Sequence, residues 1–196
     1  MRNRIMLEVR WLTQDLIDTL NIPKLHFHRE NDNYGSGIPV MSKDVFQEFK
    51  GFITYSKIAK QSIEYSGADS DKILVIPLLD SEALDSVNQS SLPRLNRLLY
   101  VGRTAADKRL DLAVEIAKRL SIPIDVVGKY NKATIDWLGR QNFVNFVGAI
   151  PHDEVINLMK SNKALLAPGA ESWGLAVVEA LQSGMEVFAS KFTGVT

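Results

Sequence analysis

Short, dense apolar runs alternate with helical patterns along most of this chain of 196 residues. The runs are rich in Val, Ile, Leu and Phe and do not alternate strictly with polar residues, which is typical of strands buried on both faces of a parallel sheet. The predicted strands are residues 24–28, 52–56, 73–77, 98–101, 124–128, 143–148, 164–168 and 187–190. Strands that alternate with helices predict an α/β protein with a doubly wound sheet.

The segments between these strands carry apolar residues at helical spacing. Leu110, Val114 and Ala117 recur three or four residues apart, with charged residues on the opposite face. The same spacing predicts helices around 155–159 and 175–181, and a further helix at about 4–20. Ser121 precedes Ile-Pro and is expected to end the helix before it, because proline cannot continue a helix.

Composition excludes several classes of protein. The 23 basic and 23 acidic residues give a net charge of zero, so no electrostatic argument favours nucleic acid as a partner. The absence of cysteine excludes disulfides, thiolate nucleophiles and cysteine-bound zinc. No apolar run approaches the roughly 18–20 residues of a membrane span, and the start does not resemble a signal peptide. We expect a cytoplasmic protein.

Residues 80–96 interrupt the alternation of predicted strands and helices. They are polar, rich in Ser and Asn, and contain Pro93 without sustained periodicity. The segment is interpreted as a linker between a partial α/β unit, 1–79, and a nearly complete α/β domain, 97–196.

The segment 164–184 combines a buried strand, a loop with glycine, and a helix that Gly184 ends. Ser172 suits the N-cap of this helix, and Gly174 would let a ligand approach the backbone. A helix N-terminus at the carboxyl end of a parallel sheet attracts anions, and the carboxylates of Glu171 and Glu179 can accept hydrogen bonds from hydroxyls. The pattern fits a sugar diphosphate, although two glutamates at this spacing are common by chance.

A second cluster of charge lies upstream. Gly102 allows a sharp turn after a strand, and Arg103 and Lys108 flank the short loop that follows. Two cations at the end of a strand can neutralise a diphosphate. Taken alone, however, this segment is more typical of a solvated helix start.

Four stretches together resemble a known family. They are VGRTAADKRLDLAVEIAKRL, IDVVGK, FVNFVGAIPHDEV and ALLAPGAESWGLAVVEALQSGMEVFASKFTGV. In this order they are similar to the family 4 retaining glycosyltransferases, and FITYSKIAKQSIEYSGADSDKILVIP extends the similarity back to about Phe52. The resemblance implies a GT-B-type fold with two Rossmann-like domains. This chain would hold the nucleotide-sugar-binding domain, 97–196, truncated at its C-terminal end, after a truncated N-terminal domain.

The resemblance also implies residue roles. Arg103 and Lys108 would hold the donor diphosphate, Glu171 would contact the transferred sugar, and Glu179 would bind the ribose hydroxyls. Val147, Gly148, Ala149 and Ile150 would border the nucleobase. The other donor-binding residues it implies are Gly102, Ser172, Trp173, Gly174 and Leu175. Trp173 stands where the family commonly has Phe, and Ala176 and Glu186 replace Pro, so the departures change no polar contact.

Three histidines and one acidic pair remain. His26 and His28 share one face of a strand, but a metal site lacks a third ligand there, whereas the resemblance implies that His28 reaches the donor sugar. His152 suits a helix start and receives no role. Asp69-Ser-Asp71 precedes a strand instead of following one, so it is interpreted as an exposed turn and not as a metal motif.

The resemblance implies a retaining transfer of sugar from a nucleoside-diphosphate-sugar donor to an unknown glycan, lipid or small-molecule acceptor, with no cofactor and no metal. A non-catalytic nucleotide-sugar-binding module, or one subunit of a split enzyme that needs a complementing N-terminal subunit, is the alternative. A nucleotide-sugar epimerase ranks lower. Peripheral association with a membrane is compatible with each.

Overall fold

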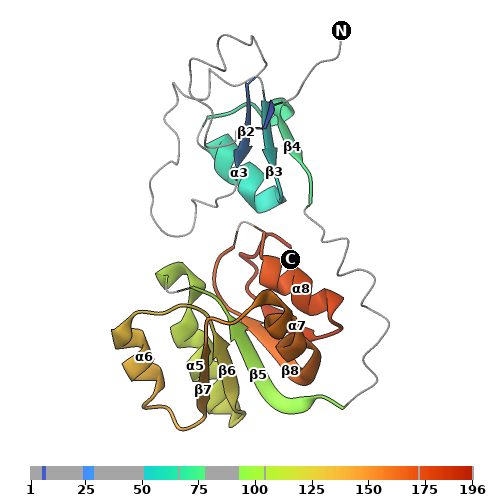
Figure 1. Cartoon of the computed structure of the whole chain (residues 1–196). Coiled ribbons are helices and arrows are strands. Elements are labelled where there is room, and N and C mark those ends of the chain that lie inside the picture. Colours follow the sequence, from blue (N-terminus) through green and yellow to red (C-terminus); the bar gives the residue numbers. More distant parts are fainter. Residues whose placement is uncertain are drawn as a thin grey trace. The chain divides into compact units, whose positions relative to one another are not determined.

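The computed structural model describes residues 6–7, 24–28, 51–65, 67–77, 93–103, 105–171 and 173–195, the first two segments by their backbone. The chain divides into two compact units, Met1–Leu78 and Leu79–Thr196 (Figure 1). Both units contain parallel sheets with helices, as the sequence predicts. Within the described segments, every helix is too short or too polar to cross a bilayer.

The first unit contains a parallel sheet with the order β1-β2-β3-β4. Its elements are β1 (Met6–Leu7), β2 (Lys24–His28), β3 (Gly51–Thr54), α3 (Lys57–Tyr65) and β4 (Ile73–Val75). The side chains of Phe52, Ile63 and Ile73 form its core, with α3 packed on the sheet. A short 3-10 turn, Ser70–Lys72, precedes β4, and Asp69 and Asp71 there are exposed, which confirms the predicted turn.

Two features of this unit differ from the sequence prediction. Met6–Leu7 pairs with β2 as a strand, so the predicted helix at 4–20 is wrong at these residues, because backbone pairing with Lys24 and Leu25 outweighs the local pattern. Helix α3 was not predicted. Its buried residues are Ala59, Ser62 and Ile63, and two of these are too small or too polar to form an apolar stripe.

The second unit contains a five-stranded parallel sheet with the order β7-β6-β5-β8-β9. Its strands are β5 (Leu95–Val101), β6 (Ile124–Val127), β7 (Val144–Gly148), β8 (Asn162–Ala167) and β9 (Glu186–Ala189). Its helices are α5 (Leu110–Leu120), α6 (Lys132–Leu138), α7 (His152–Ser161) and α8 (Leu175–Gln182), and a 3-10 turn, Ala106–Lys108, precedes α5. The strand order reverses between β5 and β8, which confirms the doubly wound topology.

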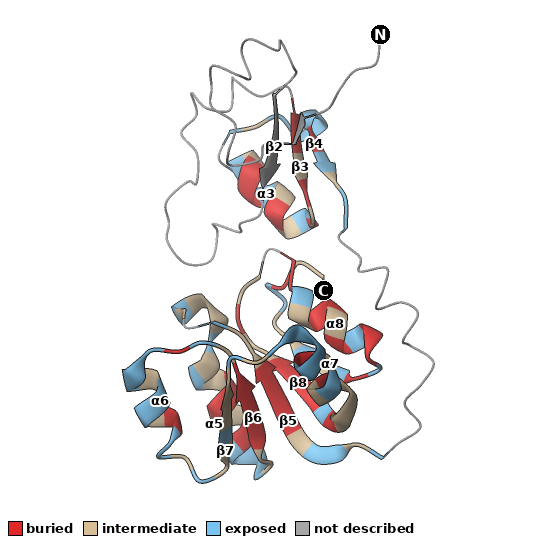
Figure 2. Ribbon diagram, in the orientation of Figure 1, coloured by how far each residue is buried: buried red, intermediate tan, exposed pale blue. Residues whose placement is uncertain are grey.

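Both faces of this sheet are covered by helices. Leu98 and Tyr100 of β5 pack in a cluster with α5 and α6, whereas Leu99, between them, packs with α7 and α8. The middle of β5, the whole of β6 and most of β8 are therefore buried (Figure 2). This burial on both faces is the physical reason for the dense apolar runs in the sequence.

Strand β5 begins at Leu95, earlier than the predicted residue 98. Leu95 and Asn96 are exposed, so the start of the strand lacks the apolar density that marks its centre. Just before it, Arg94 donates hydrogen bonds to the backbone carbonyls of Met159, Asn162 and Ser183 at 2.6, 2.9 and 2.8 Å. These carbonyls lie at the C-terminal ends of α7 and α8, where a cation stabilises unpaired carbonyl groups.

The amino half of the sheet contains a buried polar network. Asp125 on β6 is 3% exposed and pairs with Arg97 of β5. Asn145 of β7 and Asn162 of β8 donate hydrogen bonds to its two carboxylate oxygens at 2.8 and 2.7 Å. Burial raises the pKa of Asp125, but the hydrogen bonds from Arg97, Asn145 and Asn162 outweigh it and hold the pKa below its ordinary value.

Candidate functional site

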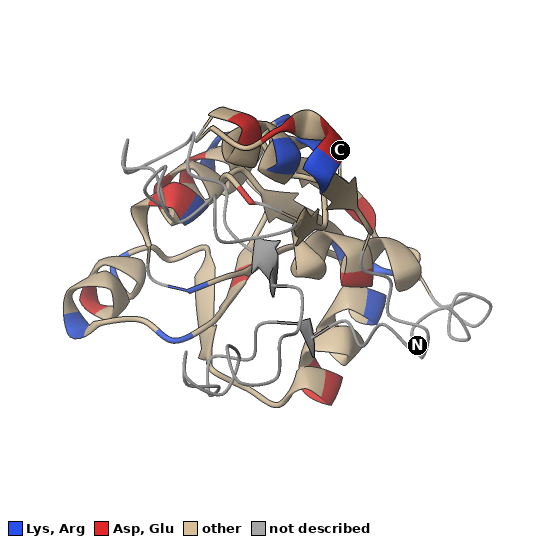
Figure 3. Ribbon diagram, turned by 90° about the horizontal axis from the view of Figure 1, so that it is seen from above, with Lys and Arg blue, Asp and Glu red and all other residues tan. Residues whose placement is uncertain are grey.

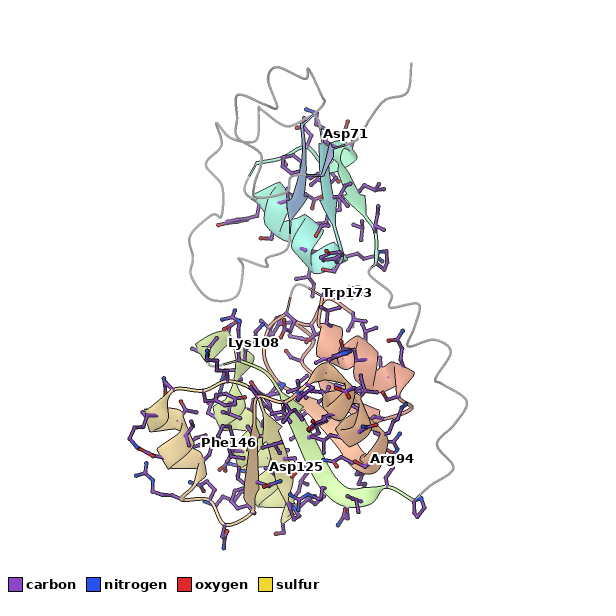
Figure 4. The ribbon with its side chains drawn as sticks, viewed as in Figure 1. Asp71, Arg94, Lys108, Asp125, Phe146 and Trp173 are labelled. Atoms are coloured by element: carbon purple, nitrogen blue, oxygen red, sulfur yellow. The ribbon has the colours of Figure 1, made fainter. Side chains whose placement is uncertain are left out.

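The candidate site lies at the carboxyl end of the second sheet, where the strand order reverses. Open α/β sheets bind ligands at such a switch point because the loops after the two adjacent strands diverge there. In this unit those loops follow β5 and β8. Figure 4 shows Lys108 at this end of the sheet and Asp125 toward the opposite end.

Lys108 joins the two loops. Its side chain is 14% exposed, and its Nζ lies 2.8 Å from Oε2 of Glu171 and 3.3 Å from Oδ2 of Asp107. The same Nζ donates a hydrogen bond to the carbonyl of Ala170 at 3.2 Å. The structure therefore brings together a cation and a carboxylate that the sequence assigned separately to a diphosphate and a sugar.

Arg103 follows Gly102 directly after β5, as expected. Its side chain is 70% exposed, and its Nη2 lies 3.9 Å from Oδ2 of Asp107, the long limit of an ion pair. The guanidinium is thus held weakly and faces solvent at the same loop as Lys108. Charged residues of both signs are interleaved over the described parts of the chain (Figure 3), so local pairing and not a broad field governs the site.

The two loops pack backbone against backbone at Gly169. A Cβ atom there would lie 2.5 Å from the carbonyl oxygen of Asp107 and 2.6 Å from Cα of Lys108. The amide of Ala170 donates a hydrogen bond to that same Asp107 carbonyl at 3.0 Å. Only glycine permits this approach, which is what places Lys108 beside the loop that carries Glu171.

Backbone contacts fix Glu171 itself. It forms a β-bridge with Thr193, its amide donates to the carbonyl of Phe192 at 3.1 Å, and its carbonyl accepts from Gly194 at 2.9 Å. The backbone of the loop is therefore anchored on the segment after β9. The side chain of Glu171 is 36% exposed and remains accessible to a ligand.

The start of α8 corrects one prediction. The N-cap of α8 is Gly174, with φ 93° and no side-chain hydrogen bond, so the predicted N-cap role of Ser172 is wrong. A left-handed backbone at this position suits glycine and not serine. Ser172 itself lies outside the described residues. Trp173 is buried at 8% exposure, and Leu175 is the first residue of the helix and is exposed.

Two buried tyrosines support the β5 loop. The hydroxyl of Tyr100 donates to the carbonyl of Lys108 at 3.1 Å, and the hydroxyl of Tyr130 donates to the carbonyl of Gly102 at 2.8 Å. Burial raises the pKa of both hydroxyls, so both remain protonated donors at neutral pH. Sequence reasoning missed both residues, because their role depends on contacts with backbone groups that no spacing rule predicts.

Glu179 lies on α8 with 17% of its side chain exposed, and its Oε1 is 3.1 Å from Nε2 of His152. His152 is the first residue of α7, the helix-start position that the sequence predicted. Val147 and Gly148 are the last two residues of β7, and Ala149 and Ile150 follow them before this helix, at the same end of the sheet. Val147 and Ile150 pack against the core under α7 and α8, and Ala149 is exposed.

His28 lies in the other unit. It is the last residue of β2, with its backbone paired to Thr54 of β3, and its side chain is outside the described residues. His26 occupies the same strand, two residues earlier. The structure therefore leaves the predicted contact between His28 and a donor sugar as a prediction.

The fold and the switch-point site define a Rossmann-like ligand-binding unit within a GT-B-type architecture. The chain belongs to the family described as "Glycosyl transferases group 1", whose sequence profile matches residues 85–196 and so spans the whole of this site.

Solved structures show the same fold. HepE from Anabaena in complex with UDP and glucose superposes with a TM-score of 0.71 at 14% identity, over 92% of this chain and 56% of that chain. A glycosyltransferase from Rickettsia africae gives a TM-score of 0.66 at 15% identity, over 92% and 61%. The lipopolysaccharide outer core galactosyltransferase WaaB gives 0.63 at 19%, over 91% and 52%. The chain thus spans little more than half the length of these structures. No curated protein sequence matches it significantly.

Proposed function

We propose that the protein binds a nucleoside-diphosphate sugar at the carboxyl end of the second sheet and transfers the sugar, with retention of configuration, to an acceptor hydroxyl. The observation that carries this proposal is the contact between Lys108 and Glu171. A partly buried cation and a half-buried carboxylate from two different loops meet at the switch point, 2.8 Å apart. A diphosphate needs the first group, and sugar hydroxyls need the second.

The charges suit the departure of a diphosphate. Lys108 lies in partly desolvated surroundings, where a cation stabilises a developing negative charge more strongly than in water. Arg103 adds an exposed guanidinium from the same loop, and the uncapped N-terminus of α8 adds backbone dipoles. These groups supply the stabilisation that a divalent metal provides in other transferases, so we propose a reaction without metal or cofactor.

Glu171 couples the two halves of the donor. A diphosphate bound at Lys108 competes with the Glu171 carboxylate for the same ammonium group and turns that carboxylate toward the sugar. In the transfer step the bond from the anomeric carbon to the diphosphate oxygen breaks. The acceptor oxygen then bonds to that carbon from the same face, and the acceptor proton passes to the departing phosphate oxygen. Glu171 orients the sugar, and His28 is proposed to contact the donor sugar.

UDP is the first nucleotide to test, because the HepE structures contain UDP or UDP-glucose. We place the reaction in the cytoplasm, in keeping with a chain that contains no cysteine. The second candidate is a non-catalytic nucleotide-sugar-binding module, or one subunit of a split enzyme; the chain covers 56% of the HepE structure.

The test is a panel of UDP-, GDP- and ADP-sugars titrated onto the full chain by calorimetry, followed by product analysis. We expect one donor to bind below about 1 mM and Arg103→Ala to weaken it about tenfold. Arg140→Ala, which removes an exposed arginine just after α6, should leave the affinity unchanged. The proposal fails if no donor binds below that limit and Arg103→Ala has no effect. Binding without transfer or hydrolysis would favour the binding module.

A further inference from the structure

His152 and Glu179 form a pair that no pattern in the sequence predicts. His152 opens α7, and Glu179 lies on α8, with Nε2 of the histidine 3.1 Å from Oε1 of the glutamate. The imidazole is 63% exposed, whereas the glutamate side chain is only 17% exposed. The exposed imidazole of His152 is therefore hydrogen-bonded to one oxygen of the largely buried Glu179 carboxylate.

We infer that His152 is a positioning residue for nucleotide binding, and this inference rests on the proposed function. A carboxylate has two oxygens that accept hydrogen bonds. When the N–H of His152 occupies Oε1, the carboxylate is fixed in one orientation and Oε2 is directed to a second donor. The vicinal hydroxyls of a ribose are donors of the required kind, so the pair prepares Glu179 for a ribose.

A purely structural role explains the pair less well. Helices α7 and α8 are already packed together through one apolar cluster, in which Val155 and Met159 of α7 contact the core shared with Val177 and Ala180 of α8. A hydrogen bond to an exposed imidazole adds little to that packing. The hydrogen bond instead restricts the rotamers of the Glu179 side chain. Without it, the ligand would have to order that side chain on binding, and this loss of conformational entropy would lower the affinity.

The location links two parts of the nucleotide site. His152 follows residues 147–150, the segment predicted to border the nucleobase, and Pro151 alone separates them. If a bound base displaced that segment, it would therefore also move His152, which orients the Glu179 carboxylate that binds the ribose. His152 thus makes recognition of the ribose dependent on the strand-to-helix connection beside the base.

The experiment titrates the full chain with UDP, GDP and ADP, and continues with the nucleotide that binds most tightly. His152→Ala should weaken that nucleotide about five- to tenfold. His152→Gln keeps an N–H at a similar reach and should restore most of the affinity. Asp153→Ala, at the neighbouring exposed position, is the matched control and should bind as the unaltered chain does.

Two further probes separate positioning from general damage. Inorganic pyrophosphate, which has no ribose, should bind His152→Ala and the unaltered chain equally. The 2′,3′-dideoxy form of the same nucleotide should also lose its dependence on His152. An equal loss for pyrophosphate, or full nucleotide affinity in His152→Ala, overturns the inference. If none of the three nucleotides binds the unaltered chain, the proposed function itself fails, and the inference falls with it.

Discussion

The two ends of the sheet in the unit Leu79–Thr196 both contain buried or partly buried charged residues, but the partners of these residues differ between the two ends. At the amino end, Asp125 is 3% exposed, and its partners Arg97, Asn145 and Asn162 come from three other strands, β5, β7 and β8. At the carboxyl end, Lys108 and Glu171 come from loops, and their side chains are 14% and 36% exposed.

This difference separates a structural network from a binding site. Donors fixed on rigid strands satisfy both oxygens of Asp125, so the amino end offers nothing to a ligand. The carboxyl end pairs Lys108 with Glu171 across two loops and with Asp107 on its own loop, which also carries the exposed guanidinium of Arg103. Such a pair can exchange one partner for an anion. Substitutions at the two ends should therefore affect different measurements.

The largest effect is expected from Asp125→Ala. It removes the shared acceptor of Arg97, Asn145 and Asn162 and should lower the free energy of unfolding of this unit by about 3 kcal/mol. Denaturant unfolding followed by tryptophan fluorescence in a Trp11→Phe background, where Trp137 and Trp173 of this unit are the reporters, measures this change. Nucleotide affinity of the folded protein should stay within about twofold, because the network lies away from the loops.

Asp111→Ala is the control for this substitution. Asp111 is 64% exposed and pairs with Arg109, so its loss should change the stability far less. If Asp125→Ala is no more destabilising than Asp111→Ala, the amino-end network does not stabilise the sheet.

Lys108→Ala should have the next largest effect, and on binding. Loss of this partly buried cation should weaken UDP, or the preferred nucleoside diphosphate, about 100-fold, while the unfolding midpoint changes little. Calorimetric titration measures the first and thermal unfolding the second. Lys118→Ala, on the exposed face of α5, should leave both unchanged. Unaltered affinity in Lys108→Ala would place the nucleotide elsewhere.

The smallest of these effects concerns pH. The folded-state pKa of Asp125 lies below its ordinary value of 3.8, so its stabilisation is present above that pH and is lost as the pH falls toward the folded-state value. Thermal unfolding between about pH 5 and pH 3 should therefore show a steeper loss of stability in the unaltered chain than in Asp125→Asn. Parallel curves would contradict the lowered pKa.

The sequence predicted the carboxyl end better than the amino end. Strand-end loops with glycine, Arg103, Lys108 and Glu171 follow from local pattern and from the resemblance, and the structure brings Lys108 and Glu171 into contact. The Asp125 network has no such pattern, because its four residues become neighbours only through the order of the strands. A single acidic residue in an apolar strand was the one hint in the sequence.

Other differences have the same origin. The pairing of β1 with β2 and the contact of His152 with Glu179 depend on elements far apart in the chain. The N-cap of α8 was misplaced because Ser172 has the better side chain for a cap, whereas the loop geometry requires the left-handed backbone of Gly174. Local rules identified the helix, and tertiary geometry decided where it begins.

The most direct test of the proposed donor site is Glu171→Gln titrated with UDP and with UDP-glucose, or with the corresponding pair for the preferred base. Glutamine cannot form an ion pair with the Lys108 ammonium, so the diphosphate no longer competes with a carboxylate at residue 171 for that cation. The sugar hydroxyls, in contrast, lose a charged hydrogen-bond acceptor. We predict that UDP binds about threefold more tightly and UDP-glucose about tenfold more weakly than to the unaltered chain. Shifts of both ligands in the same direction, or no shift in either, would contradict a shared site for diphosphate and sugar at Lys108 and Glu171.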